Sequence, residues 1–277
     1  MTISGENLSP LIAFVLELTL LQSSSTFVIA IVVFILIIIS YLVGHYIRQR
    51  ALRKNPERSK IDLGPINGTL LGLLGLLLAF TFSMSSARYD NRRSAVIEEA
   101  NAIGTVILRT DIYPDSMRSV LRSNLKEYLE ARIAFYGAHM NLEKAAAAYR
   151  KADEIGKKVW SIAATYAKDN PTVTISSQLI PALNSMIDIT TTRLAVGEAT
   201  VPDSIMYFLF ILCFCSAFLL GYDTKVKIDW IVVMGFAIML SSTVFNIIDL
   251  DRPRSGFIDM DKPNQKIVEL RDMLIND

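Results

Sequence analysis

The residues that could carry out chemistry in this chain of 277 residues are few, and they do not form a catalytic motif. His45 and His139 have no partner at a spacing used for metal binding or acid–base work. Cys213 and Cys215 lie in one apolar stretch, where free cysteines usually act as small packing residues. Nucleotide-binding, zinc-protease and serine-hydrolase patterns do not occur. We therefore expect no enzyme, no catalytic residue, no cofactor and no metal site.

A group of charged residues follows two of the apolar stretches, and it could bind a cation or form ion pairs. The spacing of a calcium loop is not present, and the arginines among the carboxylates favour ion pairs. We predict that an aspartate after the fourth apolar stretch pairs with an arginine after the second, although such charges could also simply snorkel to water. The group, here called the polar clamp, consists of Arg88, Arg92, Glu99, Asp249, Asp251 and Arg252.

Four runs without formal charge are long enough to cross a bilayer, and they are residues 26–46, 63–87, 204–222 and 230–248. At ~1.5 Å per residue, each can cross a hydrocarbon core of ~30 Å as a helix. Helices are expected because backbone groups in lipid need partners within their own segment. The net charge is +1 and the mean hydropathy is +0.38, so a nucleic-acid partner is not expected and the lipid bilayer is.

The stretch between the second and third spans has a helical pattern rather than a lipid-compatible one. Apolar residues recur at helical spacing beyond Arg88, so the second span should continue to Ile112, with Pro114 ending it. Asp115 and Asn141 are predicted to cap the next two helices. The chain is thus predicted to be all-α, with an interfacial segment at 1–25, a hairpin at 26–87, a helical-bundle insert at 88–200, a second hairpin at 201–249, and a polar tail at 250–277 with a short helix at 264–275.

Basic residues set the expected orientation. The loop after the first span, between Arg48 and Lys60, is rich in Lys and Arg, whereas residues 1–25 contain neither. The positive-inside rule places that loop in the cytoplasm, which puts the insert and both termini outside the cell membrane. Arginines of the polar clamp would then flank the outer face, against the same rule.

Small residues recur at steps of three and four along one face of the second span. Such faces let another helix backbone approach closely in lipid. The partner could be the first or fourth span of the same chain, a second copy of the chain, or the water of a pore. On the fourth span, Ser242 and Asn246 form a polar stripe that leads to Asp249. The small-residue stripe consists of Gly64, Gly68, Gly72, Gly75, Ala79 and Ser83.

Three pieces of the sequence resemble a known family. They are the run LLAFTFSMSSARYDNRRSAVIEEANAIGT within Leu73–Thr110, the set Leu183, Asn184, Asp188 and Arg193, and the ending DLDRPRSG that starts at Asp249. Together they resemble the bestrophin-like domain-of-unknown-function family of bacterial integral membrane proteins, from about Tyr41 to Gly256.

That family is similar to bestrophins, pentameric anion channels with two spans, a helical insert and two more spans. The resemblance implies a homo-oligomeric channel that passes small ions, with Leu76, Phe80 and Phe82 on the second span near a constriction. The acidic calcium-binding run of the bestrophin tail is not present here. A function of another class stays open: a membrane-anchored sensor or scaffold whose insert binds a ligand or a partner.

Overall fold

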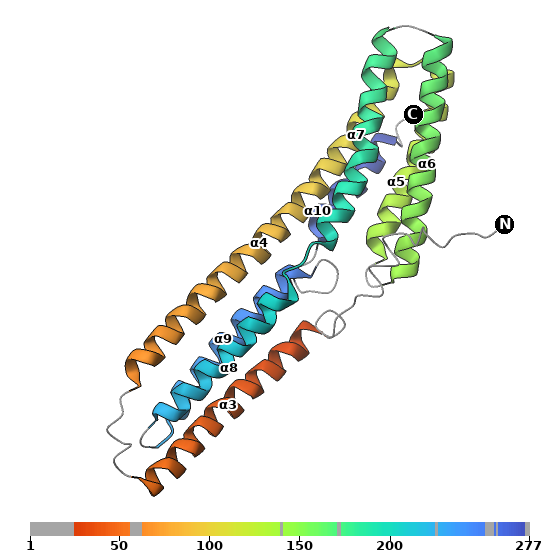
Figure 1. The fold of residues 1–277 in the computed structure, drawn as a ribbon. Coiled ribbons are helices and arrows are strands. Elements are labelled where there is room, and N and C mark those ends of the chain that lie inside the picture. The colour runs from red at the N-terminus through yellow and green to blue at the C-terminus, as the bar shows by residue number, and fades with distance from the viewer. Residues whose placement is uncertain are drawn as a thin grey trace, which may run out of the picture. The chain divides into compact units, whose positions relative to one another are not determined.

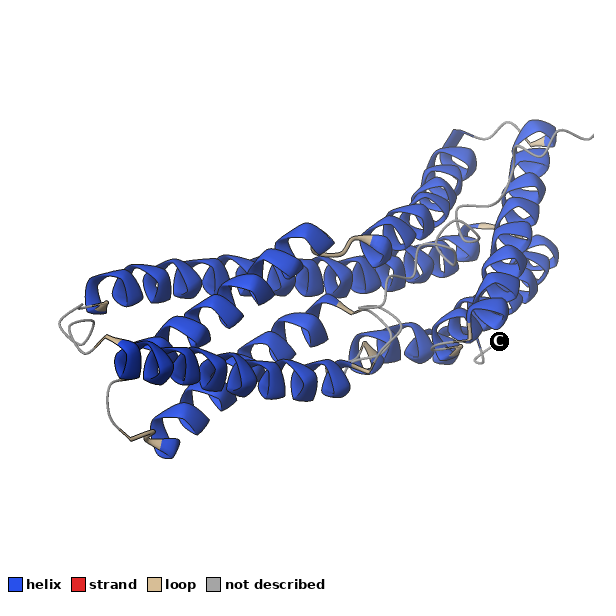
Figure 2. Ribbon diagram, turned by 60° about the horizontal axis from the view of Figure 1, so that its bottom comes forward, coloured by secondary structure: helices blue, strands red, loops and turns tan. Residues whose placement is uncertain are grey.

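The computed structural model describes residues 25–55, 63–138, 141–170, 173–224, 227–252, 258 and 260–274. These residues form helices and short connections, and no strand occurs among them (Figure 2). The all-α prediction is therefore confirmed. The predicted interfacial segment lies outside the described residues, apart from residue 25, and His139 lies outside them as well.

The prediction of four spans is confirmed. Among the described residues, four helical stretches are long and apolar enough to cross a membrane: Thr26–Lys54, Gly64–Ile112, Ser177–Asp223 and Trp230–Asp251. The first is helix α3 (Thr26–Lys54), the second is α4 (Gly64–Arg109) with the short 3-10 helix η2 (Thr110–Ile112), the third includes α8 (Asp203–Asp223), and the fourth is α9 (Trp230–Asp251) (Figure 1).

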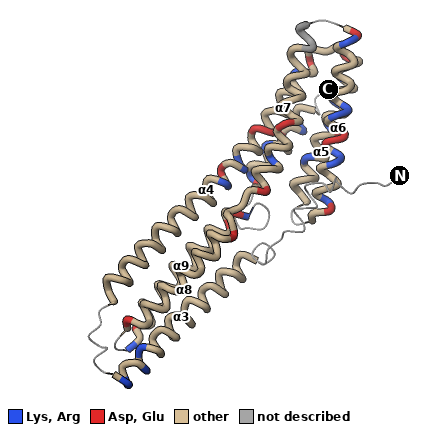
Figure 3. The backbone as a smooth tube through the Cα atoms, viewed as in Figure 1, with Lys and Arg blue, Asp and Glu red and all other residues tan. Residues whose placement is uncertain are grey.

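Two boundaries of the spans have a clear physical origin. Helix α4 continues without a break past the charged residues that follow its apolar part, as its helical periodicity predicted. Helix α3 ends at Lys54 rather than at Tyr46, so Arg48 belongs to a helix and not to a loop. Long parts of α3, α4, α8 and α9 carry no charged residue (Figure 3). The charges of α3, α8 and α9 lie near the helix ends, whereas those of α4 begin at Arg88, in the interior of this long helix.

The chain divides into two compact units, each with its own core. The membrane unit comprises the described residues within Thr19–Tyr89 and Thr200–Arg252. The bundle unit comprises those within Asp90–Ala199 and Pro253–Asp277. Helix α4 contributes residues to both.

The closest helix packing in the membrane unit joins α3 and α8 through two glycines. A Cβ atom added at Gly44 would lie 2.1 Å from the backbone oxygen of Phe218, and one added at Gly221 would lie 2.0 Å from that of Tyr41. Beside them, the hydroxyl of Ser40 donates to the backbone oxygen of Phe214 at 2.7 Å. The two backbones are therefore in direct contact, as small residues allow in lipid.

The bundle unit contains the end of α4, then α5 (Asp115–Gly137), α6 (Leu142–Asp169) and α7 (Val173–Glu198). The C-terminal residues belong to it as well, as α10 (Asp261–Val268) and the 3-10 helix η3 (Glu269–Leu274). Ile267 of α10 is fully buried in the core of this unit. The helix predicted at 264–275 thus begins earlier, and its apolar residues are part of the bundle core.

Of the two helix caps predicted in the bundle unit, Asn141 is correct and Asp115 is wrong. Asn141 caps α6, because its side chain accepts a hydrogen bond from the backbone N–H of Lys144 at 3.0 Å. The residue before α5 is Pro114, and Asp115 is the first residue inside the helix. The carboxylate of Asp115 forms an exposed ion pair with Arg118 at 3.0 Å instead of a cap.

We predict that Gly44→Ala or Gly221→Ala separates α3 from α8. The added methyl group would collide with backbone, which cannot move aside as a side chain can, so the cost should reach or exceed the ~1–3 kcal/mol typical of overpacking. Thermal unfolding of the purified protein in detergent measures the effect. The matched control is Gly235→Ala on α9, where no atom lies within 4 Å of the new methyl group. Equal stability of the three variants would contradict this packing.

Candidate functional site

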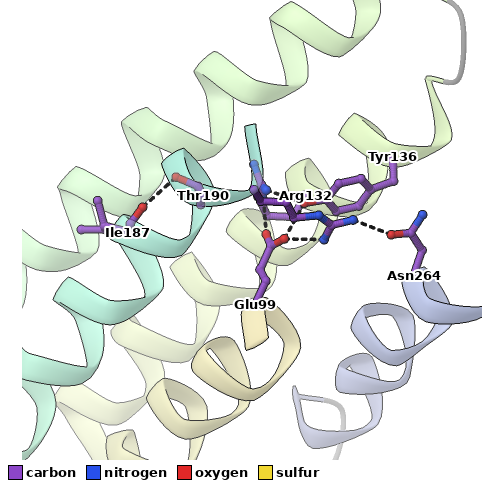
Figure 4. A network of polar contacts seen from close by, with 7 residues as sticks. Glu99, Arg132, Tyr136, Ile187, Thr190 and Asn264 are labelled. Carbon is purple, nitrogen blue, oxygen red and sulfur yellow. Dashed lines mark hydrogen bonds and ion pairs between the residues drawn. The ribbon is translucent and has the colours of Figure 1, made fainter. Parts of the chain in front are cut away.

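The bundle unit buries a polar network around one carboxylate, Glu99 of α4 (Figure 4). Its Oε1 accepts from Nε of Arg132 at 2.5 Å, and its Oε2 accepts from Nη1 of Arg193 and from the hydroxyl of Tyr136. Arg132 also donates to the Tyr136 hydroxyl, and Arg193 donates to Oδ1 of Asn264 at 2.6 Å. The Glu99 network, made of these five residues, therefore joins α4, α5, α7 and α10.

Aromatic rings surround the two guanidinium groups of this network. The Arg193 guanidinium lies 3.5 Å from the centre of the Tyr136 ring. That of Arg132 lies 5.1 Å from the centre of Phe135 and 5.9 Å from that of Tyr149. Ring faces attract cations most strongly where water is excluded, and Arg132 is fully buried. Two arginines and one carboxylate give the network a net charge of +1.

The ionisation of the Glu99 network follows from its neighbours. Burial acts to raise the pKa of Glu99, but the positive charges of Arg132 and then Arg193 outweigh burial and hold this pKa below its ordinary value. Burial raises the pKa of Tyr136 well above its usual range. The network therefore consists of an ionised carboxylate, charged guanidiniums and a neutral phenol.

Three other members of the predicted polar clamp, Arg92, Asp251 and Arg252, hold helix ends. Arg92, which is buried, donates to the backbone oxygens of Val196 and Ala199 at 3.4 and 2.9 Å, and so binds the carbonyl end of α7. The carboxylate of Asp251 accepts from the backbone N–H of Val201 at 2.9 and 3.0 Å. Glu99 belongs to the buried network rather than to these helix ends.

Arg252 donates to the hydroxyl of Thr26 at 3.2 Å, at the first residue of α3. Asp249 is buried and Arg88 is half-buried. The start of α3, Val201 just ahead of α8, and the end of α9 are therefore connected by polar side chains at one end of the membrane unit. The pairing of an aspartate of α9 with an arginine of α4 stays a prediction.

The small-residue stripe of α4 is open. All six of its residues are exposed, and no neighbouring atom of the described chain lies within 4 Å of a Cβ atom added at Gly68, Gly72 or Gly75. The residues of α4 that are buried in the membrane unit lie on another face: Asn67, Leu74, Thr81 and Ser85. The tight helix contact of this unit is instead made by the glycines of α3 and α8.

Large apolar side chains lie beside the open stripe. Leu76, Phe80 and Phe82 have exposed fractions of 54%, 60% and 45%. On α9, Ser242 and Asn246 are exposed as well, and the Asn246 amide nitrogen donates to the backbone oxygen of Ser242 at 2.8 Å. Two spanning helices thus present faces that the chain itself leaves uncovered among the described residues.

The sequence placed Glu99 in the polar clamp and Arg193 in the family resemblance, but Arg132 was missed, although it could have been found by its position. Arg132 lies on the same helix face as Leu125, Tyr128 and Leu129, which are all buried, so a charge at this position needs a buried partner. Glu99 likewise falls among the buried residues of α4. Their pairing could not be read from spacing, because the chain holds many other charged residues.

A metal centre receives no support from the described part of the chain. No group of three or more His, Cys, Asp or Glu residues lies close enough together there to hold a metal ion. Cys213 is buried in the core of the membrane unit and Cys215 is exposed.

Comparison with known proteins gives one match. The family model described as the Bestrophin-like domain matches residues 34–262, which is most of the chain. The match supports the resemblance noted in the sequence. No significant match was found among curated proteins or among solved structures.

We predict that Glu99→Gln strongly destabilises the bundle unit. Removing the carboxylate leaves two buried guanidiniums without their shared counter-charge, at a cost of about 3–5 kcal/mol. Because the pKa of Glu99 is lower in the folded protein than its ordinary value of 4.5, its contribution is complete above about pH 4.5 and is lost as the pH falls through the folded-state pKa.

Thermal unfolding of the detergent-solubilised protein between neutral and acid pH measures both effects. Glu130→Gln on α5 is the control, because Glu130 forms an exposed pair with Arg271 and should be worth at most ~1 kcal/mol. If Glu99→Gln is no more costly than the control, the network does not stabilise the unit.

Proposed function

Because the chain belongs to the Bestrophin-like domain family, we propose that it is a homo-oligomeric membrane channel or pore that passes small ions. The function is then transport rather than catalysis. The observation that carries the proposal is the open small-residue stripe of α4. The proposed orientation places the bundle unit and the termini outside the cytoplasm, as the basic loop after the first span predicts.

The two faces of α4 differ in what they can contact. One face is buried against the membrane unit through Asn67, Leu74 and Thr81. The other carries glycines, and a glycine-rich face adds little contact with lipid but lets a second helix approach closely. Such a face is best covered by α4 or another helix of a second copy, or exposed to the water of a pore.

Exposed polar groups on α9 support the same assembly. The side chains of Ser242 and Asn246 lie on the surface of a spanning helix, where hydrocarbon would leave an amide poorly solvated. In an oligomer, these groups would contact another copy or water. This places α9 beside α4 among the helices that a neighbouring copy or a pore would meet.

Leu76, Phe80 and Phe82 are the candidates for a constriction. They are large, exposed and close in sequence to the open glycines of the same helix. A ring of such side chains contributed by several copies would narrow a path by its size and would repel water when the path is closed.

The polar clamp has a supporting role in this proposal. We propose that Asp249 pairs with Arg88 where α4 and α9 leave the membrane. Asp249 is buried in the membrane unit, where its charge already interacts with that of Arg252, and Arg88 would add a second positive charge from α4 to this group.

We predict that Gly72→Leu disrupts the assembly and removes most of the ion flux of the protein in liposomes, because a side chain of this size blocks close contact at the stripe. Phe80→Ala should leave the assembly intact and raise the flux by widening the constriction. Flux assays and native mass measurements give both readouts.

Two matched controls use exposed residues of α8 that lie away from its packed pair Ala217 and Gly221. Cys215→Leu enlarges an exposed small residue, and Phe208→Ala truncates an exposed phenylalanine. Both should behave as the unmodified protein does. A monomer without flux under these conditions rejects the channel and favours the sensor or scaffold.

For the clamp, we predict that Asp249→Asn and Arg88→Gln are not additive. A direct pair should give a coupling free energy of about 0.5–3 kcal/mol in a double-mutant cycle on thermal stability in detergent. Strict additivity would show that the two charges act separately.

A further inference from the structure

Arg48 is the most unusual charged residue of the membrane unit. It lies near the C-terminal end of α3, it is fully buried, and none of its three guanidinium nitrogens has a hydrogen-bond partner among the described residues. No carboxylate of the described residues forms an ion pair with it. A buried guanidinium without an acceptor is costly, since the loss of water is not compensated.

Within the described part of the chain, Arg48 contacts an aromatic ring. Its guanidinium lies 5.2 Å from the centre of the Tyr222 ring, near the end of α8. A ring over one face of the guanidinium does not accept from its N–H donors, which lie in the plane of the group and are left without an acceptor. Tyr222 follows Gly221, where α3 and α8 are in backbone contact, so both partners are held on a rigid support.

The groups around Arg48 favour an anion from outside the chain, rather than a carboxylate of the chain itself, as its partner. Asp223, next to Tyr222, accepts a hydrogen bond from the amide nitrogen of Asn67 at 3.1 Å and does not reach Arg48. The Nδ1 atom of His45, one turn before Arg48, is also buried without a partner. Arg50, Arg53 and Lys54 follow on the same helix and are exposed, so the local charge is positive.

The position of Arg48 along the spanning helix indicates which kind of anion it would meet. The charge-free part of α3 ends just before it, at the level where a spanning helix reaches the lipid headgroups. Phosphate is bound well by the planar donors of arginine, and basic sites between spanning helices commonly hold anionic headgroups. We propose that Arg48, oriented by Tyr222, binds the phosphate group of an anionic lipid between the ends of α3 and α8.

The test compares thermal stability of the purified full chain with and without lipid. Phosphatidylglycerol in detergent micelles should raise the Tm of the unmodified protein, and phosphatidylcholine should raise it less. Arg48→Met should lose the response to phosphatidylglycerol. Without lipid, the same variant should be at least as stable as the unmodified protein, because it replaces an unpaired buried charge by an apolar side chain.

The matched control is Arg50→Met, which removes the same charge two positions along the helix from an exposed site and should keep the full response. Tyr222→Leu, which retains Arg48, should weaken it. The proposal is wrong if Arg48→Met responds to phosphatidylglycerol as the unmodified protein does, or if neither protein responds. If inorganic phosphate at equal concentration gives the same Arg48-dependent rise, the lipid is excluded as the source of the phosphate group.

Discussion

The structure depends on what the two faces of α4 can contact in a bilayer. Helices in lipid gain little from hiding apolar surface, so close packing and polar contacts decide which faces associate. The membrane unit uses one face of α4, through residues such as Leu74 and Thr81, and leaves the glycine face open. A face built for close approach that the chain itself does not cover is the physical reason to expect further copies.

The helices of the two units are held together by different contacts. In the membrane unit, α3 and α8 bring backbones together at Gly44 and Gly221, and the Ser40 hydroxyl donates to a backbone oxygen of α8 beside this contact. In the bundle unit, four helices converge on the ionised Glu99, whose two arginines and one tyrosine complete its hydrogen bonds. The C-terminal residues belong to this second arrangement through Asn264.

The architecture could be predicted from the sequence because its determinants are local. Charge-free runs locate the four spans. Pro114 directly precedes α5, and Asn141 directly precedes α6, so both residues mark the start of a helix. The site could be predicted only in part, because its contacts join distant residues. Arg132 lies 33 positions from Glu99, and Arg48 was expected to be a loop charge. The glycine pair of α3 and α8 was missed, although Ser40 with Gly44, and Ala217 with Gly221, repeat the small-residue spacing of α4.

The arrangement of copies in a lipid nanodisc tests the central claim most directly, because it can be imaged without changing any residue. The account predicts several identical copies, in which Gly72, Gly75 and Ala79 of each α4 face a neighbouring copy or a shared central axis. A single copy whose glycine face meets only lipid would contradict it.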